Sequence, residues 1–418
     1  MKKTYNNIRG TLDFDASQAL TFRAISDEAQ RIFGLYGYQE IILPLLEEKD
    51  LFIRGVGQGT DIVERQMFKI EGKDVVLRPE GTAQVVRYYL QNSLHKKSDF
   101  HKFFYVGPMF RGERPQKGRL RQFHHLGAEA IGSDSFYLDA EMILLSLEIL
   151  DSVGIKEKKL LINSLGCKKD KDAFSRLLKE SLTKAKKQLC EDCLRRSEVN
   201  PLRVLDCKKE ECRKQVKSFI GQDGSSNHLC SDCSKNYKNL TNLLKDLGVK
   251  YVHEPYLVRG LDYYTNTVFE ITSSRLGAQS AIGAGGRYNN LIDALGGPSK
   301  PAIGFALGVE RILLALDKKD DQPKVDVFIA IAGEDLREPA FKILNSLRKE
   351  GIISDYDYCQ KSLKGQLRFA QKNGARYVVI VGDDEFKQGC VLLKDMEKGS
   401  QKQVKIGDLC SELTPAVN

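Results

Sequence analysis

A hairpin-like stretch with a strongly cationic loop constrains the fold of this chain more than any other feature. Residues 103–131 read FFYVGPMFRGERPQKGRLRQFHHLGAEAI, two apolar runs on either side of a loop rich in arginine and lysine. Apolar runs of strand length that flank a Gly- and Pro-containing loop predict an antiparallel β-hairpin. The positive charges are therefore expected at and beside its tip.

Side chains of the second strand alternate between two faces. One face is expected to carry Arg121, Phe123, His125, Gly127 and Glu129, and the other Gln122, His124, Leu126 and Ala128. Arginine suits phosphate, a phenyl ring can stack on a base, and a carboxylate can hold an amine or an imidazole N–H. The first face thus predicts a platform for a nucleotide beside a small cationic ligand. The alternative is a solvated hairpin whose arginines keep an edge strand soluble.

Length and charge set limits on the rest of the chain. A chain of 418 residues allows two or three domains, and a net charge of +9 is compatible with a polyanionic partner without identifying one. The N-terminus has no apolar signal region and no run is long enough to cross a bilayer, so a cytoplasmic protein is expected. In that reducing compartment, clustered cysteines indicate metal ligands rather than disulfides.

The N-terminal part predicts a helix and two strands. Residues 17–36 carry apolar side chains at helical spacing, and residues 38–48 read as a buried strand that Pro44 interrupts, which places it at an edge, a bulge or an interface. A short strand then leads into a turn and a helix opened by Thr82. Glu80 lies in this turn, where a capping or dipole role is the usual interpretation.

Residues 166–247 differ from their surroundings. They are rich in lysine and mostly helical in pattern, and β-rich sequence resumes directly after them. We therefore interpret them as an insertion. In residues 251–272, strand alternation would place Tyr263 and Tyr264 on opposite faces. The glycines of residues 281–292 permit a close approach of backbone or ligand but do not match a dinucleotide-binding turn.

The insertion contains two C-x₂-C pairs with the spacing of a tetrahedral thiolate zinc site. The preferred ligands are Cys190, Cys193, Cys230 and Cys233. Cys207 and Cys212 lie between the pairs and could replace one member. The competing interpretation is plain packing, since the first pair sits in a helical, leucine-containing context.

The remaining sequence predicts a helix that carries a cation and a second domain. Residues 301–316 read as strand, glycine turn and helix, with Arg311 in the first helical turn, where its charge opposes the helix dipole unless a phosphate binds there. From residue 325 strands and helices alternate, which predicts a separate α/β domain with a largely parallel sheet. Residues 317–324 are the expected linker.

Five segments in order resemble the histidyl-tRNA synthetases, which are class II aminoacyl-tRNA synthetases. Residues 38–47 are similar to the family's dimer-forming first motif, 110–129 to its second and 304–314 to its third, and 257–270 and 284–288 resemble the blocks particular to the histidine enzyme. A single arginine-rich hairpin would be weak evidence. The ordered set covers nearly the whole chain.

The resemblance implies an α+β catalytic domain over residues 1–322, built on a six-stranded, mainly antiparallel sheet and interrupted by the helical insertion 166–247. It also implies an α/β anticodon-binding domain over 323–418 and a homodimer. The implied reaction attaches L-histidine to tRNA(His) through a histidyl-adenylate, with ATP as substrate and Mg²⁺ on its phosphates.

The resemblance also implies roles, carried over position by position. Arg259 and Arg111 would be catalytic. ATP would be bound by Arg111, Arg119, Arg121, Phe123 and Arg311. Histidine would be bound by Glu80, Thr82, Arg111, His125, Glu129, Arg259, Tyr263, Tyr264 and Tyr288.

One residue departs from the pattern of the family that this chain resembles. His125 stands where many family members have glutamine, so its contact with a ligand ammonium would depend on tautomer and pH.

The same fold occurs in a histidine-binding regulatory subunit of ATP phosphoribosyltransferase, which does not charge tRNA. That subunit lacks the anticodon domain, whereas this chain has residues 325–413 and Arg259. A generic ATP-binding protein would not account for the histidine blocks.

Overall fold

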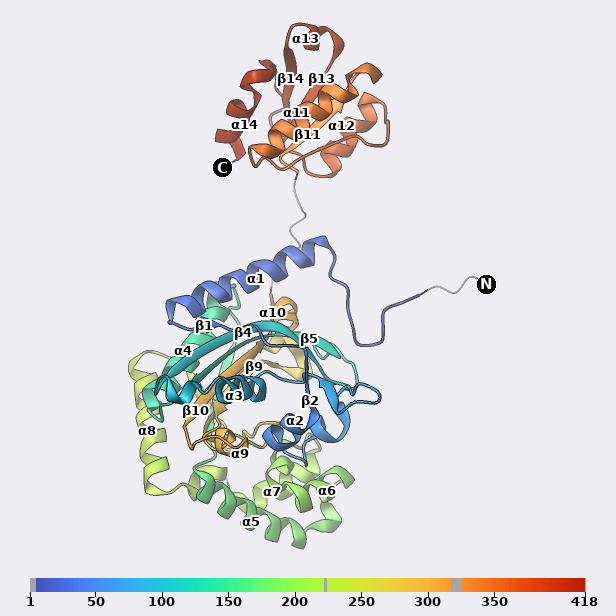
Figure 1. Cartoon of the computed structure of the whole chain (residues 1–418). Helices are drawn as coiled ribbons and strands as arrows, with labels where there is room; N and C mark the ends of the chain where they lie inside the picture. The colour runs from blue at the N-terminus through green and yellow to red at the C-terminus, as the bar shows by residue number, and fades with distance from the viewer. Residues whose placement is uncertain (1–4, 222–223, 317–324, 418) are drawn as a thin grey trace. The chain divides into compact units, whose positions relative to one another are not determined.

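The computed structural model of the chain describes residues 5–221, 224–316 and 325–417, which form two compact units (Figure 1). The expected linker 317–324 and the expected boundary at residue 322 lie outside the described residues. No helix in the described part of the chain is long and apolar enough to span a membrane.

A twisted eight-stranded sheet forms the centre of the larger unit, with the strand order β1-β4-β5-β10-β9-β8-β6-β7. The strands are β1 (Gln39–Glu40), β4 (His101–Phe110), β5 (Gln122–Ile131), β6 (Lys159–Ser164), β7 (Tyr251–His253), β8 (Thr265–Thr272), β9 (Ala281–Arg287) and β10 (Ala302–Gly308). The six central strands pair antiparallel, and the short β1 and β7 join the two edges in parallel. The mainly antiparallel sheet is thus confirmed, widened by one short strand at each edge.

The predicted hairpin is β4 and β5, which pair over their whole lengths from His101 opposite Ile131 to Phe110 opposite Gln122. The predicted alternation is also confirmed. Leu126 and Ala128 enter one hydrophobic core, whereas Phe123 packs against the core on the opposite side of the sheet.

Helices cover both faces of this sheet (Figure 1). One core cluster joins the sheet to α1 (Ala16–Leu35), α4 (Phe136–Ser152), α8 (Ser231–Asp246) and α10 (Val309–Ala315). The other joins it to α2 (Lys49–Val56), α3 (Thr82–Gln91), α5 (Lys168–Lys184), α6 (Glu191–Val199), α7 (Glu210–Ile220) and α9 (Leu291–Ala294). The predicted insertion is helical, and it shares both cores with the sheet.

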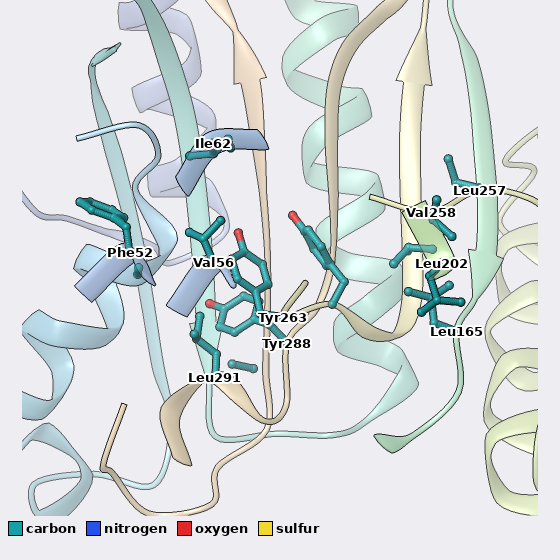
Figure 2. Packing of buried hydrophobic residues seen from close by; sticks show 14 of the residues in the cluster. Phe52, Val56, Ile62, Leu165, Leu202, Leu257, Val258, Tyr263, Tyr288 and Leu291 are labelled. Atoms are coloured by element: carbon teal, nitrogen blue, oxygen red, sulfur yellow. The ribbon is translucent and has the colours of Figure 1, made fainter. Parts of the chain in front are cut away.

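The insertion packs closely on the sheet because its short 3₁₀ helix, Pro201–Asp206, contributes apolar side chains. Figure 2 shows Leu202 of this helix beside Leu165, Leu257 and Val258, which come from the segments around β6 and β8. All four side chains are buried. The insertion therefore forms one wall of the space above this face of the sheet.

Two predictions about strands are wrong. Residues 38–48 do not form one buried strand, because the chain leaves the sheet after Glu40 and pairs again only in β2 (Leu46–Glu48) with β3 (Val75–Leu77). Residues 254–264 are not a strand either, so alternation does not separate Tyr263 from Tyr264, and both are buried.

The smaller unit has a five-stranded sheet in the order β12-β11-β13-β14-β15, with two hydrophobic cores of its own. Its elements are β11 (Val327–Ile331), α11 (Arg337–Lys349), β12 (Ser354–Tyr356), α12 (Leu363–Lys372), β13 (Tyr377–Val381), α13 (Asp383–Lys387), β14 (Cys390–Asp395), β15 (Gln401–Lys405) and α14 (Leu409–Val417). The prediction of a largely parallel sheet holds for β12, β11 and β13 but not for β14 and β15, which pair antiparallel. The connection 382–389 is too short for the crossover that a parallel neighbour requires.

Candidate active site

A cavity of about 970 Å³ opens on the face of the sheet that carries Phe123 and His125. Ten of the residues predicted for the site line it: Glu80, Thr82, Arg111, Arg119, Phe123, His125, Arg259, Tyr263, Tyr264 and Arg311. Glu129 and Tyr288 lie directly beneath this lining, bonded to one another. Arg121 does not line the cavity, because it precedes β5 and its Nε donates to the carbonyl of Glu113.

A buried carboxylate forms the floor of the cavity. Glu129 is 1% exposed and accepts hydrogen bonds from the hydroxyls of Thr82 at 2.7 Å, Tyr288 at 2.6 Å and Tyr105 at 3.4 Å. The ring of Tyr263 lies 5.7 Å from that of Tyr288. Figure 2 shows these two side chains next to each other. The floor is therefore one acidic group held by three hydroxyls under an aromatic wall.

Burial raises the pKa of Glu129 to about 8, although the hydrogen bonds from Tyr288 and Thr82 partly oppose this shift. The nearby carboxylate of Glu80 raises that pKa further. A carboxyl with such a pKa changes its charge close to neutral pH. The floor can therefore hold or release one proton under the conditions in which a ligand binds.

Glycines make room for these groups. Gly304 lies opposite Glu129 on β10, and a Cβ atom there would be 1.7 Å from Oε2 of Glu129. A Cβ at Gly81 or at Gly127 would be 2.3 Å from the ring of Tyr105. Only glycine at these three positions leaves the hydroxyl and the carboxylate where they meet.

Glu80 has the capping role that its sequence position indicated. Its Oε2 accepts from the backbone N–H of Thr82 at 2.7 Å and its Oε1 from that of Ala83 at 2.9 Å, at the start of α3. Both donors are N–H groups that the first turn of a helix leaves unpaired. The capping bonds hold this carboxylate at the cavity lining, where it still has unused acceptor positions.

A row of three side chains forms the side wall. Arg111 donates from Nε to the carbonyl of Pro79 at 2.8 Å, and its guanidinium carbon lies 5.3 Å from the ring of Phe123. The ring of His125 follows at 5.1 Å from that of Phe123. The arginine is thus held from both sides rather than free to sample rotamers.

His125 is neutral in this environment. Burial, followed by the positive charges of Arg111, Arg78 and Arg311, lowers its pKa well below the usual value for histidine. Its Nδ1 is buried and has no hydrogen-bond partner among the described residues. The residue itself lines the cavity, where a neutral imidazole can accept a hydrogen bond through its unprotonated nitrogen.

Two further arginines are fixed in place by oxygen acceptors. Arg259 is paired with the carboxylate of Glu270. Burial lowers the pKa of Arg259, but the charge of Glu270, the neighbouring Tyr264 and the hydrogen bond to Glu270 together raise it above its ordinary value. Arg311 donates from Nε to the carbonyl of Gly118 at 2.9 Å, which joins α10 to the loop between β4 and β5. Both guanidinium groups line the cavity and stay charged.

Sequence reasoning did not single out three lining residues, Tyr105, Glu113 and Glu270. The register of the hairpin contained a signal for the first, because it places Tyr105 opposite Gly127. Glu113, paired with Arg119, lies in the loop between β4 and β5, and Glu270 meets Arg259 from a different segment. No local sequence pattern predicts either of these ion pairs.

The structure does not bring the four predicted zinc ligands together, because it places the two C-x₂-C pairs in different clusters. One cluster contains Cys190, Cys193, Cys207 and Cys212, and the other contains Cys167, Asp170, Cys230 and Cys233. Within each cluster the candidate ligand atoms all lie within 4.8 Å of one another. The pairs begin two different helices, α6 and α8, which pack in different places.

Comparison with known proteins gives consistent matches. A family model described as histidyl-tRNA synthetase matches residues 10–312, and a model of an anticodon binding domain matches residues 326–414. The histidine–tRNA ligase of Aquifex aeolicus is 47% identical over 406 residues, which cover 96% of this chain and 99% of the relative. That of Halothermothrix orenii is 44% identical over 98% of this chain and 99% of its own length.

Solved structures match as well. The apo histidyl-tRNA synthetase of S. aureus superposes with a TM-score of 0.80 at 33% identity, covering 98% of this chain and 100% of that one. A protein from Bacillus halodurans, described as an ATP phosphoribosyltransferase regulatory subunit/histidyl-tRNA synthetase, has a TM-score of 0.65 at 22% identity, over 92% of this chain and 100% of that one. The second likeness shows the fold alone.

The carboxyl of Glu129 is expected to lose its proton as the pH rises through about 8, because burial raises its pKa. Infrared difference spectra of the ligand-free protein across about pH 6 to 10 should lose a protonated-carboxyl band with that midpoint. Glu129→Gln should remove this step. Asp139→Asn is the control, since burial raises the pKa of Asp139 only to about 6. A step near pH 8 that persists in Glu129→Gln would contradict the assignment.

Proposed function

Because the chain belongs to the histidyl-tRNA synthetase family, we propose that it activates L-histidine with ATP and transfers the histidyl group to tRNA(His). The first step forms histidyl-adenylate and releases pyrophosphate, and the second esterifies a terminal ribose hydroxyl of the tRNA and releases AMP. The observation that carries the proposal is one cavity with an arginine–phenyl stack on its side and a buried carboxylate at its floor. These parts suit a nucleotide and an imidazole side by side.

In this proposal ATP is held by the side wall of Arg111, Phe123 and His125 and by the loop between β4 and β5. Adenine stacks on Phe123, the α-phosphate lies on Arg111, and the terminal phosphate lies on Arg311. Two observations support these roles: the bond from Arg111 to Pro79 fixes its guanidinium beside the ring, and the bond from Arg311 to Gly118 fixes the other cation. Arg119 adds positive charge at the same loop.

The floor holds the histidine side chain. Glu129 accepts a hydrogen bond from the imidazole, with Tyr263 and Tyr264 against the ring and Tyr288 keeping the carboxylate in place. Near neutral pH, Glu129 is protonated and the imidazole of histidine is neutral. The proton of Glu129 can stay between the two groups when they meet, so binding neither takes up a proton from solvent nor releases one. Recognition by a buried polar group rejects amino acids that leave it unpaired.

The α-amino group of histidine lies between Glu80, Thr82 and His125. Glu80 keeps acceptor capacity beyond its two capping bonds, and a neutral imidazole accepts from an ammonium through its unprotonated nitrogen. The lowered pKa of His125 keeps it neutral, which removes the dependence on pH that histidine in place of glutamine would otherwise introduce. The hydroxyl of Thr82 donates its proton to Glu129, so its oxygen remains to accept from the α-amino group.

Arg259 lies on the reacting groups, where it neutralises charge on the histidine carboxylate and the α-phosphate. Its pairing with Glu270 sets its position before substrates bind, and a preorganised cation is worth most in a cavity that excludes water. The attacking nucleophile is the substrate carboxylate, so the protein needs no activated serine or cysteine. The carboxylates of Glu113 and Glu270 line the cavity and fit Mg²⁺, which takes one or two carboxylates together with phosphate oxygens and would neutralise the phosphates.

The smaller unit binds the anticodon region of the tRNA in this proposal. Its family match is to anticodon binding domains, and its hydrophobic cores are built from its own residues. The activation chemistry needs only the larger unit, since all the lining residues of the cavity come from it.

The chain forms a homodimer through the segment around Pro44. Ile42 is 93% exposed, Leu45 42% and Leu46 51%, a concentration of apolar surface in the segment that resembles the family's dimer-forming motif. Exposed apolar side chains that lie together mark an interaction surface. A second copy of the chain covers them.

A structural zinc ion binds the thiols of Cys190, Cys193, Cys207 and Cys212, which revises the predicted ligand set. The Sγ atoms of Cys190 and Cys207 are 4.0 Å apart, close to the separation of about 3.8 Å between sulfurs on one tetrahedral zinc ion. Three of the four cysteines are buried. The ion connects the start of α6 to the segment that leads into α7, and so stabilises this part of the insertion.

Exchange of pyrophosphate into ATP is expected only when L-histidine is supplied, and Arg259→Ala is expected to slow it by at least about a hundredfold, as for loss of one preorganised donor. Histidine affinity should change much less. Arg54→Ala, a solvent-exposed arginine of α2, is the control and should match the unaltered chain. Histidine binding without any exchange would favour the regulatory-subunit interpretation, and near-normal exchange by the Arg259 variant would remove its assigned role.

Removal of everything after Gln322 should leave histidine-dependent exchange intact and lower tRNA charging at least about tenfold, since even one lost base contact costs ~1–3 kcal/mol. Initial rates of exchange and of charging on the same preparation separate the two effects. Equal charging by the shortened and full chains would exclude an anticodon role for the smaller unit.

Ile42→Asp should convert the dimer to a monomer, because a carboxylate buried in an apolar interface is strongly unfavourable. Sedimentation equilibrium measures the mass directly. Leu314→Asp, on an exposed leucine of α10 outside the segment, is the matched control and should leave the mass unchanged. A monomeric unaltered chain would refute the proposed assembly.

A further inference from the structure

We propose that Cys167, Asp170, Cys230 and Cys233 bind a second zinc ion, separate from the one at Cys190, Cys193, Cys207 and Cys212. The second group lies where the first and last helices of the insertion, α5 and α8, begin. Its ligand set, three thiolates and one carboxylate, differs from the four thiolates of the other cluster. The proposal does not depend on the reaction that the chain catalyses.

The donor atoms already have nearly the spacing that a metal requires. The three sulfurs and one carboxylate oxygen all lie within 4.8 Å of one another. Zinc–sulfur bonds of about 2.3 Å in a tetrahedron put the donors roughly 3.8 Å apart. A contraction of about an ångström or less per pair therefore closes the site.

The same local geometry supplies both halves of the site. Cys167 is the N-cap residue of α5 and Asp170 follows three positions later, while Cys230 is the N-cap residue of α8 and Cys233 follows three positions later. Side chains at the N-cap and the third helical position lie on one face of a helix start, as in a capping box. Two helix starts that face each other thus bring four ligands to one point.

Backbone and side-chain donors are aimed at the ligand atoms. The N–H of Cys167 donates to the sulfur of Cys233 at 3.2 Å, and the side-chain amide of Asn266 donates to the same sulfur at 3.5 Å. The N–H of Cys230 donates to Oδ2 of Asp170 at 3.1 Å. Such donors stabilise the negative charge of a metal-bound thiolate or carboxylate and orient the ligand.

The site connects the insertion to the wall of the cavity. Asn266 is the second residue of β8 and exchanges backbone hydrogen bonds with Leu165 and Gly166, at 2.8 and 2.7 Å, just before α5. Lys171 in the first turn of α5 donates from Nζ to the carbonyls of Asp262 and Tyr264. A metal that fixes the start of α5 therefore also fixes the segment that carries Tyr264.

Zinc content measured by elemental analysis of protein purified without chelator tests the proposal. The unaltered chain should hold two equivalents, and the double variant Asp170→Asn, Cys233→Ser should hold one. The double variant Cys207→Ser, Cys212→Ser should also hold one, from the second site. Cys359→Ser with Cys390→Ser, in the smaller unit, is the matched control and should hold two.

A single equivalent that survives in Asp170→Asn, Cys233→Ser and disappears in Cys207→Ser, Cys212→Ser would overturn the second site. Zinc-free unaltered protein that takes up no zinc on titration would overturn both sites.

A measurement on the unaltered chain avoids any effect of the variants on folding. Cys230 and Cys359 are both exposed, so iodoacetamide should modify them at similar rates if neither binds metal. We expect Cys359 to react at once and Cys230 to react only after a chelator is added, as mapped by mass spectrometry. Equal reaction of both thiols before chelation would overturn the proposal.

Discussion

The burial of one carboxylate organises the catalytic face of the larger unit. Burying a polar carboxyl group away from water is unfavourable unless hydrogen bonds satisfy its oxygens. At Glu129 the compensation comes from Thr82 at the start of α3, from Tyr105 on β4 and from Tyr288 after β9. Three elements that are distant in sequence must therefore meet at β5, and that meeting point is the floor of the cavity.

The arginines of the cavity carry positive charge and are also held in place by groups of the protein. Three of them are each tied to an oxygen of the protein: Arg111 to the carbonyl of Pro79, Arg311 to that of Gly118 and Arg259 to the carboxylate of Glu270. These ties reduce the reorganisation needed when phosphates arrive, which is where a preorganised site gains its advantage. An adenylate-forming reaction, which needs positioning and charge neutralisation rather than a covalent nucleophile, matches such a site.

Helix starts explain several other features that look unrelated in the sequence. Glu80 accepts the unpaired N–H groups at the start of α3, and the thiols of Cys190, Cys167 and Cys230 lie at the N-caps of α6, α5 and α8. The first turn of a helix has N–H groups without partners and attracts negative charge. This attraction accounts for the position of the Glu80 carboxylate, and it places the three thiols beside N–H groups without helical partners.

The sequence by itself determined the features that repeat over short distances. Alternation along residues 121–129 was enough to place Phe123 apart from Leu126, and the family motifs in their order were enough to predict the antiparallel sheet. The tertiary structure alone decided which groups meet across long loops. It placed Tyr263 and Tyr264 in the same wall, joined Arg259 to Glu270, and divided the thiols between two clusters, one of which includes Cys167 and Asp170. Periodicity is fixed by local backbone geometry, whereas the partner of a loop residue or a helix start depends on how separate elements pack, and no local pattern records that packing.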